Sequence, residues 1–112
     1  MGYKKASTED VDSVVPDEYG GMWFLRDALD AERLGVTVLE LEPDAKGKEH
    51  NHEGDGQEEV YLVVKGEVDV DLPDSDETVT LREDEAVRLD ADETRQILNH
   101  GDKRAKLVLA GA

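Results

Sequence analysis

Residues 47–66 read GKEHNHEGDGQEEVYLVVKG, and this stretch decides the fold. His50 and His52, two of the chain's three histidines, stand two positions apart, and Glu59 opens an apolar run that ends at Gly66. Residues two apart on a strand face the same side, so the two imidazoles can project together. Two imidazoles and a carboxylate form the ligand set of non-haem iron sites, with coordination positions left open. The alternative is that both histidines are solvated loop residues and that Glu59 is one more surface acid.

The segments around this stretch alternate between apolar and polar residues, as half-buried strands do. EVDVDL (67–72) alternates strictly, and GVTVLELE (35–42) does so in part, whereas residues 22–35 fit either a strand or a short helix. Further short strands are expected over residues 60–66, 78–82, 86–90, 94–99 and 105–111. Many short strands and no long periodic helix predict an all-β barrel or sandwich.

The length and composition limit the kind of protein. A chain of 112 residues forms one domain, and we expect an N-terminal strand or arm over residues 1–34 that leads into a barrel over residues 35–112. No stretch approaches the ~20 apolar residues needed to cross a bilayer, and no secretory signal is recognised at the N-terminus. The chain has no cysteine, which excludes disulfides and thiolate ligands.

The charge balance is strongly acidic. Twenty-nine Asp and Glu oppose thirteen Lys and Arg, for a formal net charge of −16, and the acids are spread along the chain. Molar salt shortens the Debye length to about 3 Å and removes most of the resulting repulsion. We therefore expect a cytoplasmic protein of a salt-accumulating halophile, the alternative being an acidic mesophile protein. The acidic surface disfavours nucleic acid and anionic membranes as partners, because both bind to a basic face.

The opening stretch resembles the first motif of the cupin family. That motif is a glycine, five residues, His-x-His, a short turn, Glu, six residues and a glycine. His50, His52, Glu59 and Gly66 fit it, whereas Asp44 stands in place of the leading glycine and the turn before Glu59 is longer than usual. A hairpin loop absorbs such an insertion at small entropic cost.

Residues 84–99 match the spacing of the second cupin motif. Three turn positions, a glycine, a proline and a second glycine in the family, are all aspartate here (Asp84, Asp90 and Asp92). Aspartate accepts left-handed and turn conformations better than most residues. The resemblance covers about residues 35–110 and implies a small single-domain cupin, a double-stranded β-helix or jelly-roll barrel, and, given the acidic coat, one of haloarchaeal origin.

The resemblance fails at Arg95, which stands where the family has its third histidine ligand. A guanidinium has only donors and cannot bind a metal. His100 is no obvious substitute, because on a continuous strand it faces the other side. Either Arg95 holds an anionic ligand beside a metal bound by the three motif residues and water, or no metal binds and Arg95 pairs in a bidentate manner with Glu59. A third alternative is a surface arginine paired with the abundant acids.

The resemblance also implies a pocket with further contacts from Tyr61 and Asn99. Tyr61 and the cluster of Met22, Trp23 and Phe24 fit core or dimer packing better than ligand contact, and Asn99 fits a turn-supporting role. The expected cofactor is a divalent transition metal, Fe, Mn, Ni or Zn, and the expected partner is a small organic, anionic molecule.

Three functions are compatible with these features. The first is a metal-dependent enzyme for oxygenation, isomerisation or hydrolysis of a small organic acid. The second is a binding or sensory barrel without turnover, with or without metal. The third is a structural role in which barrel edges pair into a homodimer.

Overall fold

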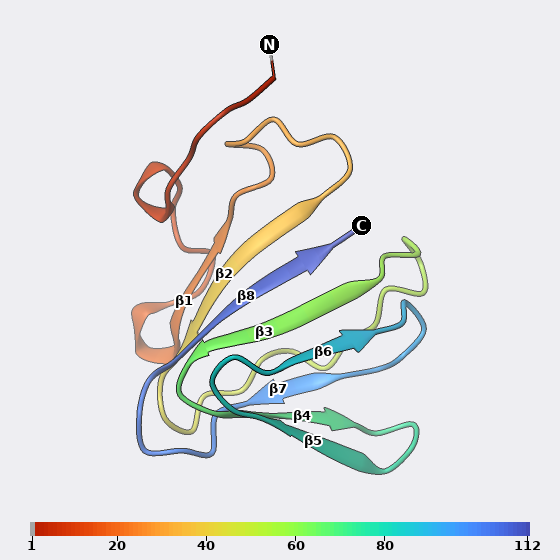
Figure 1. The fold of residues 1–112 in the computed structure, drawn as a ribbon. Helices are drawn as coiled ribbons and strands as arrows, with labels where there is room; N and C mark the ends of the chain where they lie inside the picture. The colour runs from red at the N-terminus through yellow and green to blue at the C-terminus, as the bar shows by residue number, and fades with distance from the viewer. Residues whose placement is uncertain (1) are drawn as a thin grey trace.

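The computed structural model describes residues 2–112 and consists almost entirely of strands (Figure 1). The strands are β1 (Gly20–Phe24), β2 (Gly35–Leu41), β3 (Glu59–Lys65), β4 (Val68–Leu72), β5 (Glu77–Leu81), β6 (Ala86–Leu89), β7 (Gln96–Leu98) and β8 (Ala105–Gly111). Two short 3₁₀ turns, Thr8–Asp10 and Asp17–Tyr19, precede β1. The strands expected from residue 35 onward are all present, and the all-β prediction is confirmed.

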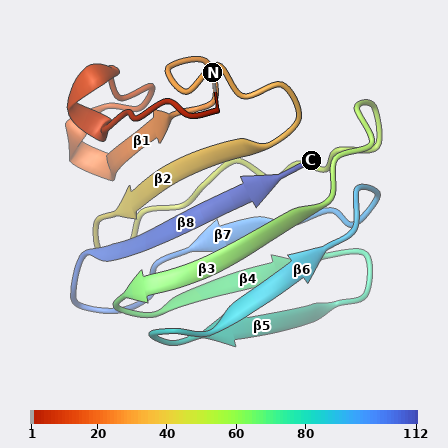
Figure 2. The same ribbon diagram turned by 45° about the horizontal axis from the view of Figure 1, so that its top comes forward.

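The strands form two sheets that face each other. One has five strands in the order β1-β2-β8-β3-β6, and the other has three in the order β5-β4-β7, all antiparallel. Figure 2 shows β4 and β7 behind β8, β3 and β6. Neighbours far apart in sequence, such as β2 and β8, produce the jelly-roll path of a double-stranded β-helix.

The core lies between the two sheets and is built mainly of valine and leucine. Along β4 the residues Val68, Val70 and Leu72 are buried while the two aspartates between them are partly exposed. On β3 the buried positions are Tyr61 and Val63. The alternation of apolar and polar residues therefore determines which side of each strand faces the core.

Residues 22–35, whose sequence fits either a strand or a short helix, start as a strand and continue as turns. β1 pairs with β2 over its whole length, from Gly20 opposite Leu41 to Phe24 opposite Thr37. The N-terminal part of the chain thus adds an outer strand to the larger sheet. Among residues 2–112, no helix is long and apolar enough to span a membrane.

Aspartate occupies the left-handed turn positions. Asp44 and Asp84 have φ angles of 67° and 68°, and both stand where the cupin motifs have glycine. The other non-glycine residues with positive φ in the described chain, Asp30 and Asp76, are also aspartates. Left-handed backbone is unfavourable for most L-residues and is tolerated best by Gly, Asn and Asp, so these substitutions preserve the turns.

Candidate metal centre

The three residues of the first motif are brought together from two layers of the barrel. His50 and His52 lie on the irregular segment between β2 and β3, which runs beside the start of β7. The backbones of His50 and Arg95 exchange two hydrogen bonds of 3.0 and 2.9 Å, and the His52 amide donates to Ala91 O at 2.7 Å. Glu59 is the first residue of β3, in the five-stranded sheet, and has the inward parity of Tyr61.

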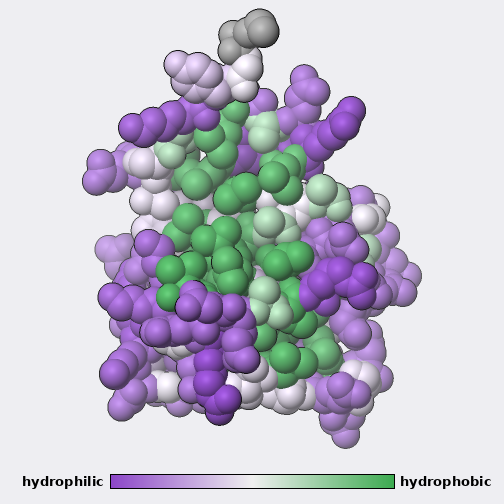
Figure 3. All heavy atoms as spheres, in the orientation of Figure 1, coloured by the Kyte–Doolittle hydropathy of each residue, from purple (hydrophilic) through white to green (hydrophobic). Residues whose placement is uncertain are grey.

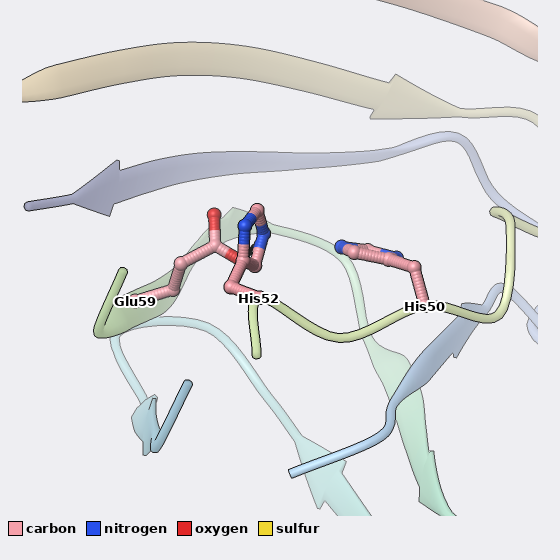
Figure 4. A group of neighbouring side chains, drawn as sticks. All are labelled: His50, His52 and Glu59. Carbon is pink, nitrogen blue, oxygen red and sulfur yellow. Dashed lines mark ion pairs between the residues drawn. The ribbon is translucent and has the colours of Figure 1, made fainter. Parts of the chain in front are cut away.

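His50, His52 and Glu59 form a compact group that could hold a metal ion. One ligand atom from each residue lies within 4.8 Å of the other two. Figure 4 shows the His52 and Glu59 side chains side by side and the His50 ring directed toward them. The nearest pair, His52 Nε2 and Glu59 Oε1, is 3.0 Å apart. Two atoms bound to one ion at ~2.1 Å and at right angles would also lie ~3 Å apart.

Hydrogen bonds fix the orientation of both imidazoles. His50 Nδ1 lies 2.9 Å from Lys48 O, and His52 Nδ1 lies 3.1 Å from both carboxylate oxygens of Asp55. Carbonyl and carboxylate oxygens only accept, so Nδ1 donates in both rings, and in a neutral ring Nε2 then keeps its lone pair. The hydrogen bond from His52 lowers the pKa of Asp55, which stays charged at neutral pH. Such carboxylate–histidine pairs commonly support metal ligands.

Glu59 Oε1 has no hydrogen-bond donor in the described chain, although a buried carboxylate oxygen needs one. This oxygen is buried and has no hydrogen bond within residues 2–112, although His52 Nε2 is close. If Nε2 carries a lone pair, two electron-rich atoms face each other across 3.0 Å, which is unfavourable without a cation between them. The donor set therefore fits a first-row divalent ion bound by two nitrogens and one oxygen.

Arg95 lies next to this group and is completely buried, with 0% of its side chain exposed. Its Nη2 donates to Asp90 O at 2.9 Å, and its Nη1 lies 3.7 Å from Glu59 Oε1, too far for a hydrogen bond. Nε and Nη1 have no hydrogen-bond partner among residues 2–112. The contact is therefore a single long ion pair and lacks the bidentate geometry expected for a guanidinium that replaces a metal. Arg95 is also no surface residue.

A cavity of about 440 Å³ opens beside His50, His52 and Glu59. Tyr61 lines it, together with apolar residues from β1, β2 and β8, whereas Arg95 does not. Burial, and next the charge of Glu59, raise the pKa of Tyr61, so its phenol stays protonated. Tyr61 is thus both a core residue and a neutral hydrogen-bonding group at the cavity wall.

Asn99 is not part of this cavity. Its side-chain amide donates to Leu41 O and Lys103 O, and its oxygen accepts from the Gly101 amide. It lines a different cavity, near Gly66. The turn-supporting interpretation of Asn99 therefore matches its contacts. His100 lies away from the other histidines and close to Asp69, at 3.9 Å.

Several residues of the cavity wall were not expected there. Met22 and Phe24, for which the sequence favours core or dimer packing, follow the inward parity of β1 and line the cavity, a signal that was hidden while residues 22–35 could equally be helical. Arg26 and Gln57 lie in loops, where no periodicity shows which side chain turns inward. Arg26 is held by its own loop, because its guanidinium donates to Ala31 O and Glu32 O.

The family model described as the Cupin domain matches residues 37–111. The chain belongs to the cupin family. The match spans β2 to β8 and contains all three candidate ligands of this cupin. No curated protein sequence matches the chain.

Solved structures show the same cupin fold. A cupin protein from Bacteroides fragilis superposes with a TM-score of 0.79 at 21% identity, covering 100% of this chain and 85% of that one. A polyketide cyclase from Streptomyces resistomycificus has a TM-score of 0.76 at 22% identity, covering 96% and 78%. A sugar phosphate isomerase of the cupin superfamily from Silicibacter pomeroyi has a TM-score of 0.72 at 21% identity, covering 97% and 75%. At such identities the similarity establishes the fold alone.

Proposed function

We propose that this cupin holds a divalent transition metal through His50, His52 and Glu59 and binds a small organic molecule in the adjacent cavity. The observation that carries the proposal is the convergence of two oriented Nε2 atoms on a buried carboxylate oxygen that has no hydrogen bond. An ion with three protein ligands keeps open positions, at which it acts as a Lewis acid toward an oxygen ligand. The metal would be Fe, Mn, Ni or Zn, the ions that accept imidazole with carboxylate.

The charges around the site favour an anionic ligand. Glu59 and Arg95 cancel, so a divalent ion coordinated by the two imidazoles in their neutral form would leave a net charge of +2, or +1 with the Asp55 carboxylate included. An anion with an oxygen donor would reduce that charge. The apolar walls contributed by Met22 and Leu109 would contact the rest of the molecule. Tyr61 would donate its hydroxyl proton in a hydrogen bond.

The position of Arg95 changes its expected role. Because Arg95 is fully buried and does not line the cavity, we propose that it interacts with Glu59 and does not contact the bound organic molecule. Its guanidinium lies 3.7 Å from the carboxylate beneath the cavity and partly offsets the carboxylate charge. The proposed activity is oxygenation, isomerisation or hydrolysis of the bound organic molecule. Such an activity fits a metal ion that keeps an open coordination position.

A metal-free binding or sensory cupin is the second candidate. The buried pair of Arg95 and Glu59 favours it, since each charge partly compensates the other without an ion. In that case the cavity binds its ligand without turnover, and the histidines serve only as hydrogen-bonding groups.

Metal analysis separates the two candidates. We expect untagged protein, purified in molar KCl and dialysed against a mixture of first-row ions, to retain about one equivalent of metal. His52→Ala should lower this content sharply, whereas His100→Ala, which removes an exposed histidine outside the group, should leave it unchanged. Wild-type protein without bound metal, or equal loss in both variants, would contradict the metal site.

The acidic surface and the expected oligomer lead to two further proposals. We propose that the chain works in the cytoplasm of a salt-accumulating, haloarchaeal cell, which its net charge of −16 supports. We also propose that it forms a homodimer, because a small barrel with two open sheets gains from covering exposed apolar surface.

A further inference from the structure

Arg26, in the loop between β1 and β2, is the one lysine or arginine that lines the cavity beside His50 within the described residues 2–112. Figure 3 shows mainly hydrophobic residues over the middle of the larger sheet and hydrophilic residues around them. The other cation near the site, Arg95, is completely buried and does not line the cavity. A molecule in the cavity can therefore contact one guanidinium, that of Arg26.

Part of the Arg26 guanidinium is held by its own loop, and part of it is available to a ligand. Its Nε donates to Ala31 O at 3.3 Å and its Nη2 to Glu32 O at 2.6 Å. A guanidinium has five N–H donors, so two donors on Nη1 and one on Nη2 remain without an acceptor among residues 2–112. One hydrogen from each of these two nitrogens is the pair that a carboxylate accepts in a bidentate contact. Because the backbone contacts already order the side chain, less conformational entropy is lost when an anion binds to it.

Arg26 also has no ion-pair partner in the described part of the chain. Arg88, Arg95 and Arg104 each pair with a carboxylate, whereas Arg26 pairs with none of the acidic residues, although the chain has twenty-nine. Asp27 follows it and also lines the cavity, but this residue is exposed and forms no ion pair with it. A role limited to tying the loop accounts for the two backbone contacts and leaves an uncompensated positive charge at the cavity wall.

Two glycines keep the floor of the cavity open between Glu59 and the loop that carries Arg26. Gly111 on β8 pairs with Glu59 on one side and with Gly35 of β2 on the other. All three line the cavity, and a Cβ at Gly111 would come within 3.1 Å of Gln57 Oε1 and 3.3 Å of Glu59 Cγ. β1, the strand before the loop, lies beyond β2. With ~4.8 Å between neighbouring strands, the backbones of β1 and β3 are about 14 Å apart, so a small molecule can extend over this floor from one to the other.

We infer that Arg26 binds the carboxylate of an organic acid in this cavity, and that the acid extends across the two glycines to the candidate metal ligands. The ligand class is a small dicarboxylate or hydroxy acid, with one carboxylate for Arg26 and a second oxygen donor for the ion. The contact at the second end rests on the metal proposed above, whereas the contact with Arg26 does not. Holding the anion, a role that the sequence suggests for Arg95, is thus assigned to Arg26.

Binding of dicarboxylates and of their monoamides tests the inference. Malonate, succinate and glutarate differ in length, and each monoamide replaces one carboxylate by a neutral amide of similar shape. Isothermal titration calorimetry gives the Kd of each probe at constant KCl, for protein loaded with Ni²⁺ and for protein in chelator. The variants are Arg26→Gln, Arg26→Lys and the control Arg33→Gln, which removes the same charge from an exposed position of the same loop outside the cavity. Metal content and circular dichroism are recorded for every variant.

We expect wild-type protein to bind its preferred dicarboxylate at least ~10-fold more tightly than the corresponding monoamide. Arg26→Gln should reduce this preference at least ~5-fold, whereas Arg33→Gln should leave it within about twofold of wild type. Arg26→Lys keeps the charge but loses the planar fork, so its preference should decrease about 3-fold. A residue that only ties its loop would change the stability of the variants and not the ratio of the two affinities.

The outcomes separate this inference from the proposed metal site. If Arg26→Gln retains metal and shows the same preference as Arg33→Gln, the inference is overturned and the metal site stands. If wild-type protein retains no metal, the metal site is overturned, and the same comparison in chelator decides the role of Arg26. Failure of every dicarboxylate to bind to wild-type protein in either form overturns the inference. If Arg26→Gln does not fold, Arg26→Lys takes its place, and an unchanged preference in that variant overturns the inference.

Discussion

Arg95 and Arg88 provide a matched test of what burial adds to an ion pair in this protein. The Arg95–Glu59 pair and the Arg88–Glu58 pair have the same nitrogen–oxygen separation, 3.7 Å. The side chains of the first pair are 0% and 13% exposed, and those of the second are 63% and 61% exposed. Replacing either arginine by methionine removes one positive charge and keeps a long apolar side chain, so the net charge of the two variants is identical.

The expected costs differ several-fold. At 3.7 Å the Coulomb energy is about 4.5 kcal/mol with an effective dielectric constant of 20 and about 1.1 kcal/mol with that of water. Removal of Arg95 also breaks the hydrogen bond to Asp90 O and leaves the Glu59 charge buried. Breaking one side of a buried pair typically costs about 3–5 kcal/mol, whereas an exposed pair contributes about 0–1 kcal/mol. We therefore expect Arg95→Met to lose at least ~3 kcal/mol and Arg88→Met less than ~1 kcal/mol.

The measurement is equilibrium urea denaturation of metal-free protein, with chelator present and KCl held constant. Circular dichroism follows the strands, and the slope of the unfolding free energy against urea checks that both variants unfold over the same surface area. A second series with the bound metal is informative, because an ion at Glu59 compensates the carboxylate. Metal should then restore more stability to Arg95→Met than to wild-type protein.

Two results would refute this reasoning. Equal losses of stability in Arg95→Met and Arg88→Met would show that burial does not strengthen the Arg95–Glu59 contact. A gain of stability in metal-free Arg95→Met would show that the desolvation of the guanidinium outweighs its attraction to Glu59.

The turns, the buried amide and the charged surface lead to three further predictions. Asp84→Ala should destabilise the fold by about 1 kcal/mol in a thermal melt, because alanine tolerates a φ of 68° poorly, whereas Asp84→Gly should remain within about 0.5 kcal/mol of wild type. Asn99→Ala removes three hydrogen bonds to backbone groups and should cost about 3 kcal/mol without lowering metal content; loss of metal with retained stability would contradict its structural role. The melting temperature should rise between ~0.1 M and molar KCl, and a flat profile would reject the idea that acidic repulsion limits stability.

The strands and the candidate ligands could be predicted because their signals are local. The alternation after Glu59 is enough to place it on the same side as Tyr61 and Val63, and the structure has all three on the inner face of β3. The two-residue spacing of His50 and His52 likewise indicates that their side chains point to the same side of the backbone. The homodimer remains a prediction, as does the role of every site residue.

The second motif predicts Arg95 beside the candidate ligands, but its complete burial and the contacts of Asn99 depend on distant parts of the chain and have no local signal. Arg95 follows DADET, a run that is typical of an exposed turn, and only its pairing with His50 carries it inside. Asn99 donates to Leu41 O, fifty-eight residues away in the sequence. Neither contact leaves a trace in local periodicity.

The origin of the three candidate ligands in different layers has a mechanical consequence. His50 and His52 belong to a segment attached to the residues before β7, whereas Glu59 begins a strand of the opposite sheet. An ion held by all three would act as a cross-link that closes this end of the sandwich. Its release would let the two halves separate there first, so amide hydrogen exchange should quicken in residues 46–52 and around β7 while the β2–β8 pairing stays protected.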